Sequence, residues 1–138
     1  MSKEEMITGL IEVPQKQASM LLEAGYLLME LGKNKEAEET FQGVAALLPH
    51  SEVPHMALGH LYFSQGKFNQ SLTEHRAAAK LNANSALAFA SVGEVLLFLK
   101  KPDQALKELA KAIELDPDGS AGEFAKSLRD AQKQGIFG

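Results

Sequence analysis

The chain of 138 residues contains no cysteine. This absence excludes disulfides, thiolate metal sites and cysteine nucleophiles. No stretch approaches the roughly 18 uncharged apolar residues that a membrane-spanning helix needs, and no basic, apolar, small-residue leader of secretory type opens the sequence. We therefore expect a cytoplasmic protein that does not insert into membranes.

Clusters of positive charge are absent too. The chain has 14 Lys and Arg against 18 Asp and Glu, so its formal net charge is −4. No group of basic residues alternates with aromatic residues, as it does in many nucleic-acid binding proteins. The composition therefore favours a protein or peptide partner over nucleic acid.

Sequence motifs of catalysis are missing as well. The chain has no GxGxxG, P-loop, GxSxG or HExxH. Three of its four histidines, His50, His55 and His60, are spaced by five residues, which turns each about 140° from the last on a helix. Such histidines do not easily share one metal ion. We expect no enzyme, no cofactor and no metal site, and an acid/base pair of His60 with Glu94 is the alternative.

The strongest pattern that is present is a period of 34 residues. Gly25, Gly59 and Gly93 are separated by this interval, and each lies in a stretch whose apolar residues follow helical spacing. Glycine inside a helix costs about 1 kcal/mol relative to alanine. Three glycines at one phase therefore predict a shared structural need, most simply a close approach of neighbouring helices.

Three blocks of this length, 18–51, 52–85 and 86–119, align without insertion or deletion. In each block a second apolar stripe follows the glycine stripe, again with helical spacing. Turn signals such as Gly32 and Gly66 separate the two stripes. Each block therefore predicts a helical hairpin, and the fold class is all-α, an α-solenoid of three hairpins.

The aligned columns resemble the tetratricopeptide repeat, whose pattern includes Leu-Gly, Tyr, Ala, an aromatic residue and Pro over 34 residues. The residues that carry the resemblance are Leu58-Gly59 with Tyr62, Ala37 with Phe41 and Pro49, and Ala105 with Ala112 and Pro117. The second block departs from the pattern, since Ser71 and His75 replace the usual Ala and aromatic residue. We interpret it as a degenerate repeat. The family resemblance implies a protein-interaction module.

Helices are also expected on both sides of the repeats. Residues 120–138 predict a capping helix followed by a tail, and no role is assigned to Ile136-Phe137-Gly138. Residues 1–17 predict an amphipathic helix that ends at Val13-Pro14. Its apolar stripe either packs on the first block or forms a homodimer or partner contact. The residues of this stripe are Met6, Ile7, Leu10 and Ile11.

In tetratricopeptide repeats the first helix of each hairpin lines an inner, concave surface. Carried over by column, the resemblance places ten residues there: Leu22, Tyr26, Met29, Met56, His60, Phe63, Ala90, Glu94, Leu97 and Phe98. This set is mostly apolar, which predicts capture of an apolar peptide, either extended or helical. The alternative is that some of these residues belong to the core. Heat-shock chaperone tails are not expected, because their Lys, Asn and Arg clamp positions hold Leu22, Tyr26, Ala57, Leu87 and Ser91.

A narrower resemblance is to one group of proteins within this family. The chain looks like the tetratricopeptide-type (class II-like) type III secretion chaperones, because it has three repeats, an amphipathic N-terminal helix, a small acidic chain and an apolar inner surface. Such proteins hold a secreted subunit soluble in the bacterial cytosol before export. The other interpretation is a general scaffold or adaptor.

Overall fold

The structure, a computed structural model, describes the backbone of residues 3–138 and the side chains of residues 14–138. Seven α-helices and no strand occupy this described part, so the expected all-α class is confirmed. The described helices include none that is long and apolar enough to cross a membrane. Their bounds are α1 Lys3–Glu30, α2 Asn34–Leu47, α3 Val53–Ser64, α4 Phe68–Leu81, α5 Ala86–Phe98, α6 Pro102–Leu115 and α7 Ser120–Lys133.

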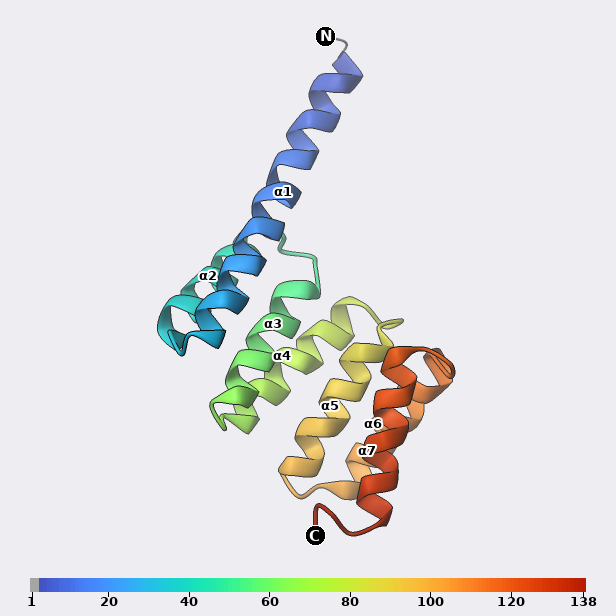
Figure 1. The fold of residues 1–138 in the computed structure, drawn as a ribbon. Coiled ribbons are helices and arrows are strands. Elements are labelled where there is room, and N and C mark those ends of the chain that lie inside the picture. The colour runs from blue at the N-terminus through green and yellow to red at the C-terminus, as the bar shows by residue number, and fades with distance from the viewer. Residues whose placement is uncertain (1–2) are drawn as a thin grey trace.

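The helices stack in chain order from α1 at one end to α7 at the other (Figure 1). α1 packs on α2, α3 on α4 and α5 on α6, which gives the three expected hairpins. Each hairpin joins the next because α2 contacts α3, α4 contacts α5 and α6 contacts α7. α1 also contacts α3, and the capping helix α7 also contacts α5.

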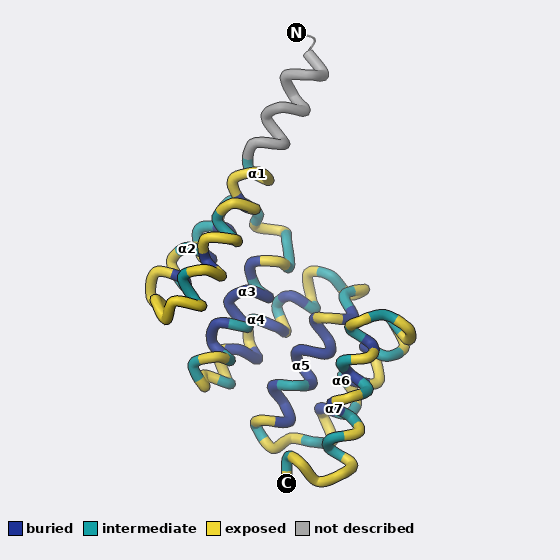
Figure 2. The backbone as a smooth tube through the Cα atoms, viewed as in Figure 1, coloured by how far each residue is buried: buried dark blue, intermediate teal, exposed yellow. Residues whose placement is uncertain are grey.

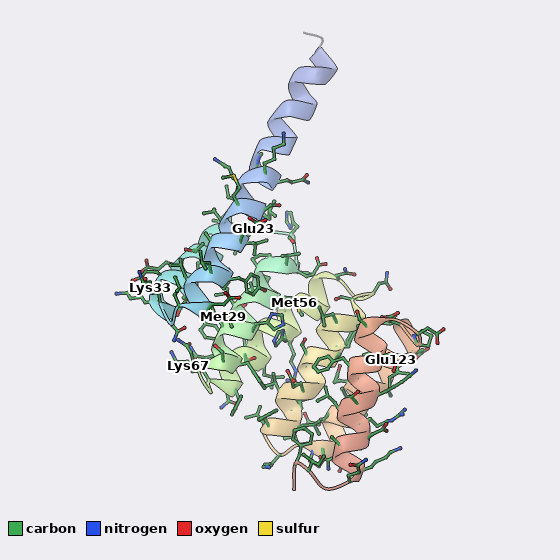
Figure 3. The ribbon with its side chains drawn as sticks, viewed as in Figure 1. Glu23, Met29, Lys33, Met56, Lys67 and Glu123 are labelled. Carbon is green, nitrogen blue, oxygen red and sulfur yellow. The ribbon has the colours of Figure 1, made fainter. Side chains whose placement is uncertain are left out.

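The same type of turn connects the two helices in all three hairpins. Shortly after the first helix of each hairpin comes a residue with positive φ: Gly32 (77°), Gly66 (74°) and Lys100 (62°) in chain order. The next N–H then reaches the carbonyl oxygen five residues back at 2.8 to 2.9 Å. This bond satisfies a helix-end carbonyl that would otherwise lack a partner. The turns fall on one edge of the first two hairpins, where Lys33 and Lys67 lie (Figure 3).

The repeated glycines mark where the two helices of a hairpin meet. A Cβ built on Gly25, Gly59 or Gly93 would lie 2.4 to 2.5 Å from a side chain of the second helix. That is far inside van der Waals contact, so the predicted close approach is confirmed. The facing side chains are Phe41, His75 and Leu109.

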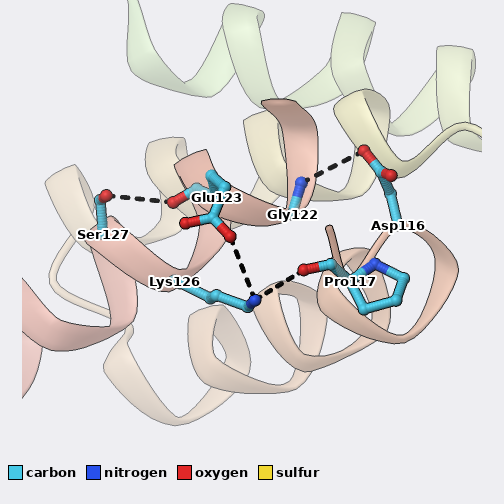
Figure 4. A network of polar contacts seen from close by, with 6 residues as sticks. All are labelled: Asp116, Pro117, Gly122, Glu123, Lys126 and Ser127. Atoms are coloured by element: carbon cyan, nitrogen blue, oxygen red, sulfur yellow. Dashed lines mark hydrogen bonds and ion pairs between the residues drawn. The ribbon is translucent and has the colours of Figure 1, made fainter. Parts of the chain in front are cut away.

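The core is deepest in the C-terminal half, where α5 is buried along most of its length (Figure 2). α7 covers this half by burying Ala125 and Leu128 against it. Its N-terminal turn is tied to the end of α6 (Figure 4), where Lys126 Nζ donates to Pro117 O at 2.6 Å. The same ammonium pairs with Glu123 Oε1 at 3.2 Å. α7 therefore acts as the expected cap.

The N-terminal boundary differs from expectation. A separate helix ending at Pro14 is wrong, because α1 is continuous over Lys3–Glu30 with Pro14 inside it. A proline inside a helix lacks an N–H donor, and its ring crowds the carbonyl oxygen four residues earlier, which costs about 3 kcal/mol. The helix nevertheless continues on both sides of Pro14. The predicted stripe of Met6, Ile7, Leu10 and Ile11 lies outside the described side chains.

Candidate functional site

The ten expected inner-surface residues come from α1, α3 and α5, the first helices of the hairpins. Tyr26 and Phe98 are 38% and 42% exposed. Five more are half-buried, namely Leu22, Met29, His60, Phe63 and Glu94. We call these seven residues the inner surface.

The other three expected residues are not open to solvent. Met56, Ala90 and Leu97 are only 7%, 0% and 1% exposed, so their assignment to an open surface is wrong. Met56 is covered by alanines of α4 and α5. Ala90 and Leu97 belong to the cluster that α7 completes. The column pattern treats each first helix as uncovered, but neighbouring helices hide these positions, as the core alternative expects.

One end of the inner surface is aromatic. The rings of Phe63, Phe68 and Phe98 lie 4.9 to 5.4 Å apart by centroid. Phe137 from the C-terminal tail adds a fourth ring, 5.6 Å from Phe98. Lys100 Nζ holds this tail by donating to the carbonyl oxygen of Phe137. The tail thus packs against one end of the inner surface.

Sequence reasoning missed two members of this aromatic group. Phe68 begins α4, a second helix, whereas the column pattern assigns inner residues to first helices alone. Phe137 lies outside the repeats, where no column applies. Their aromatic character was the available signal, but no spacing linked them to Phe98.

The middle of the inner surface is polar but uncharged near neutral pH. Tyr26 Oη lies 3.4 Å from His60 Nδ1, and the His60 ring lies 5.2 Å from that of His75. Burial lowers the pKa of His60. It also lowers the pKa of His75 to about 3, with the charge of His60 as a smaller cause. Both imidazoles are therefore neutral at pH 7.

Glu94 is the carboxylate of the inner surface, and burial raises its pKa. Within residues 14–138 no side chain forms a hydrogen bond or ion pair with it, including His60. Nor does that range hold a group of three residues able to bind a metal ion. His55 instead bonds Glu74 Oε2 at 2.8 Å between α3 and α4. The expected alternative pair of His60 with Glu94 is therefore not hydrogen-bonded within residues 14–138.

Family models of the tetratricopeptide repeat match residues 18–47 and 56–120. The chain belongs to the tetratricopeptide repeat family. It is 30% identical to anaphase-promoting complex subunit 3 of Schizosaccharomyces pombe over an alignment of 114 residues, and this alignment covers 81% of this chain and 17% of that protein. It is also 30% identical over 104 residues to human tetratricopeptide repeat protein 21A, covering 75% of this chain and 8% of that protein. The chain spans less than a fifth of these relatives.

Solved structures of tetratricopeptide repeat proteins have the same fold. The Yersinia enterocolitica type III secretion translocator chaperone SycD superposes with a TM-score of 0.79 at 19% identity, covering 91% of this chain and 96% of that one. The first repeat domain of Spaghetti (RPAP3), bound to the HSP90 peptide SRMEEVD, gives 0.76 at 23% identity, covering 89% and 95%. PcrH in complex with the chaperone-binding region of PopD gives 0.76 at 20%, covering 88% and 95%. At these identities the likeness shows the fold alone.

Proposed function

We propose that this tetratricopeptide repeat protein is a non-enzymatic adaptor or small chaperone in the cytoplasm. It binds an apolar peptide or helix of a partner protein on its inner surface. The observation that carries the proposal is the exposure of Tyr26 and Phe98, 38% and 42%, on helices that already bury another face in the core. Apolar side chains gathered on an exposed face are typical of an interaction site.

The affinity follows from the side chains available. Burying one apolar side chain contributes roughly 1.5 to 3 kcal/mol, so three anchors on the partner contribute about 5 to 9 kcal/mol. Ordering the peptide and losing its free motion cost several of these. The remainder, at most about 6 kcal/mol, corresponds to a dissociation constant on the order of tens of micromolar to millimolar. The protein is therefore a reversible binder.

The charge of the inner surface selects among peptides. None of its seven residues is Lys or Arg, and His60 is neutral at pH 7 because burial lowers its pKa. A carboxylate-rich peptide such as SRMEEVD, which is bound to RPAP3, needs cationic donors. The proposed ligand is therefore apolar rather than acidic.

A type III secretion chaperone is the second candidate. It is favoured because SycD and PcrH superpose on this chain over nearly their whole length, 96% and 92%. A solved complex of SycD holds a peptide of the translocator YopD, and a solved complex of PcrH holds the chaperone-binding region of PopD. In this role the chain keeps one secreted subunit soluble before export.

Co-expression with the products of neighbouring genes separates the two roles. A chaperone keeps one small secreted partner soluble, whereas an adaptor bridges two proteins that are stable alone. We also propose that the chain associates with a second copy of itself through the N-terminal helix α1.

The inner surface is tested by a pair of double variants matched in exposure. Tyr26→Gln with Phe98→Gln removes both exposed aromatic side chains. Leu115→Gln with Leu81→Gln changes two leucines of equal exposure, 38% and 42%, on the second helices α6 and α4. The probes are 12-residue peptides selected from a phage-displayed random library on the wild-type chain. Fluorescence anisotropy then measures their affinities.

We expect the aromatic variant to bind the selected peptides at least roughly tenfold more weakly, because two apolar contacts are lost. The leucine variant should bind as the wild type does. Circular dichroism confirms that both variants are folded. Equal affinity in a folded aromatic variant contradicts the proposal, as does a library that yields no binding peptide.

A further inference from the structure

α1 carries a row of apolar side chains that the rest of the chain leaves uncovered. Met20, Leu27 and Leu31 are 72%, 56% and 63% exposed, and Ala24 between them is exposed too. Leu31 directly follows α1, and its N–H still bonds Leu27 O at 3.0 Å, so it continues the helical turn. The steps between these residues are four, three and four. That spacing places all four on one face of the helix.

The same alternation continues through the sequence toward the N-terminus. Gln17, Val13, Leu10 and Met6 follow at steps of three, four, three and four. Together they give eight positions over four heptads, of which Gln17 alone is polar. Apolar a and d positions sustained over roughly three to four heptads indicate a coiled coil.

The helix itself is long enough to use this pattern. α1 has 28 residues, whereas every other helix has 12 to 14. It therefore extends beyond its hairpin partner at the end of the stack (Figure 1). Pro14 lies inside α1 but at neither an a nor a d position. A second helix can lie along the exposed row of α1 without displacing α2.

We propose that α1 forms a two-stranded coiled coil with α1 of a second copy of this chain, along Met20, Ala24, Leu27 and Leu31. A second copy fits because a heptad face is self-complementary, each a or d side chain entering a hole in an identical helix. Gln17 supplies the single polar layer that fixes register in such pairs. This inference rests on the proposed self-association and not on peptide binding.

The coiled coil leaves peptide binding free. Ala18 and Gly25 of α1 are buried against the stack, and Leu22 and Tyr26 lie on the inner surface. Both sets are away from the exposed row, because a helix turns about 100° per residue. Each dimer therefore presents two separate inner surfaces.

Sedimentation equilibrium of the full-length chain tests this inference. We expect the wild type to sediment with the mass of two chains. Met20→Glu with Leu27→Glu places charges in two layers of the row and should yield a monomer, with dimer affinity lower by roughly 100-fold or more. Leu81→Glu with Leu115→Glu changes two exposed leucines elsewhere and should remain a dimer.

A wild type that stays monomeric at high concentration overturns the inference. The exposed row of α1 would then contact another protein or a preceding repeat instead. A dimer that survives Met20→Glu with Leu27→Glu overturns it as well, as does dissociation of both variants. Circular dichroism checks that each variant is folded, since the changed side chains are exposed. The selected peptides should bind the monomeric variant as they bind the wild type. A failure of dimerisation is therefore distinguishable from a failure of peptide binding.

Discussion

At the scale of single residues, His75 is the unusual member of the stack. It occupies the place against the repeated glycine where the other hairpins have Phe41 and Leu109. The side chain is 2% exposed, and its Nδ1 has no hydrogen-bond partner in the described part of the chain. Water cannot stabilise a protonated imidazole there, and burial lowers the pKa to about 3.

This pKa predicts acid sensitivity. An unfolded histidine titrates near pH 6.5 and the folded His75 near pH 3, so between these values the unfolded chain binds more protons. The contribution to stability is fully present above pH 6.5 and falls as the pH drops. By pH 5 the loss is about 2 kcal/mol. Urea unfolding at pH 7 and pH 5 measures it.

The matched control is His75→Leu, which places against Gly59 the same residue type that the third hairpin has against Gly93, namely Leu109. Its stability should change less between pH 7 and pH 5, the remaining change coming partly from His60, whose pKa burial also lowers. Equal pH dependence in the wild type and His75→Leu would show that His75 is not the cause.

At the scale of helices, the close contact within each hairpin fixes how its two helices cross. Gly59 lies against His75, and Ser71 Oγ of α4 donates to Gly59 O of α3 at 2.8 Å. Such a contact leaves no room for a methyl group between the helices. By contrast, nothing lies within 4 Å of a Cβ built on Gly43, inside α2.

Two alanine substitutions should therefore have opposite effects. Gly59→Ala overpacks the contact and should lower the free energy of unfolding by about 1 to 3 kcal/mol. Gly43→Ala improves helix propensity in open space and should raise it by roughly 0.5 to 1 kcal/mol. Urea denaturation of both variants provides the measurement. A stabilised Gly59→Ala chain would refute the role given to the glycine column.

At the scale of the whole molecule, a stack of repeats needs its ends covered. α7 buries Ala125 and Leu128 against the cluster formed with α5 and α6. The tail beyond α7 adds the contact of Phe137 with Phe98. The helix and the tail can be removed separately.

Deleting residues 120–138 should expose the apolar faces of α5 and α6. We expect a thermal midpoint lower by at least several degrees, since 1 kcal/mol corresponds to roughly 3 to 6 °C at this size, and increased binding of an apolar dye. Deleting residues 134–138 keeps α7 and should cause a much smaller decrease. If both truncated chains melt together, α7 is not the cap.

Much of the fold could be predicted from the sequence. Gly25, Gly59 and Gly93 predicted the hairpins and their close contacts because these involve partners at a fixed distance along one block. The continuity of α1 through Pro14 could not, since proline is disfavoured inside a helix and helices usually end just before one. The 4–3 spacing of Met20, Ala24, Leu27 and Leu31 was in the sequence, but it became informative when the structure showed those side chains exposed.

The candidate site, like the fold, was predictable from the sequence only in part. The resemblance to the tetratricopeptide repeat, carried over by column, predicted which residues of each first helix line the inner surface, because side-chain direction follows from position along a helix. Leu97 and Phe98 are adjacent in the chain, yet one is 1% and the other 42% exposed. Only the tertiary structure decided that difference. Leu97 lies in the buried cluster that also contains Ala125 and Leu128 of α7, with Phe137 of the tail packed against it. These residues come together through the packing of the stack and not through any spacing within a repeat.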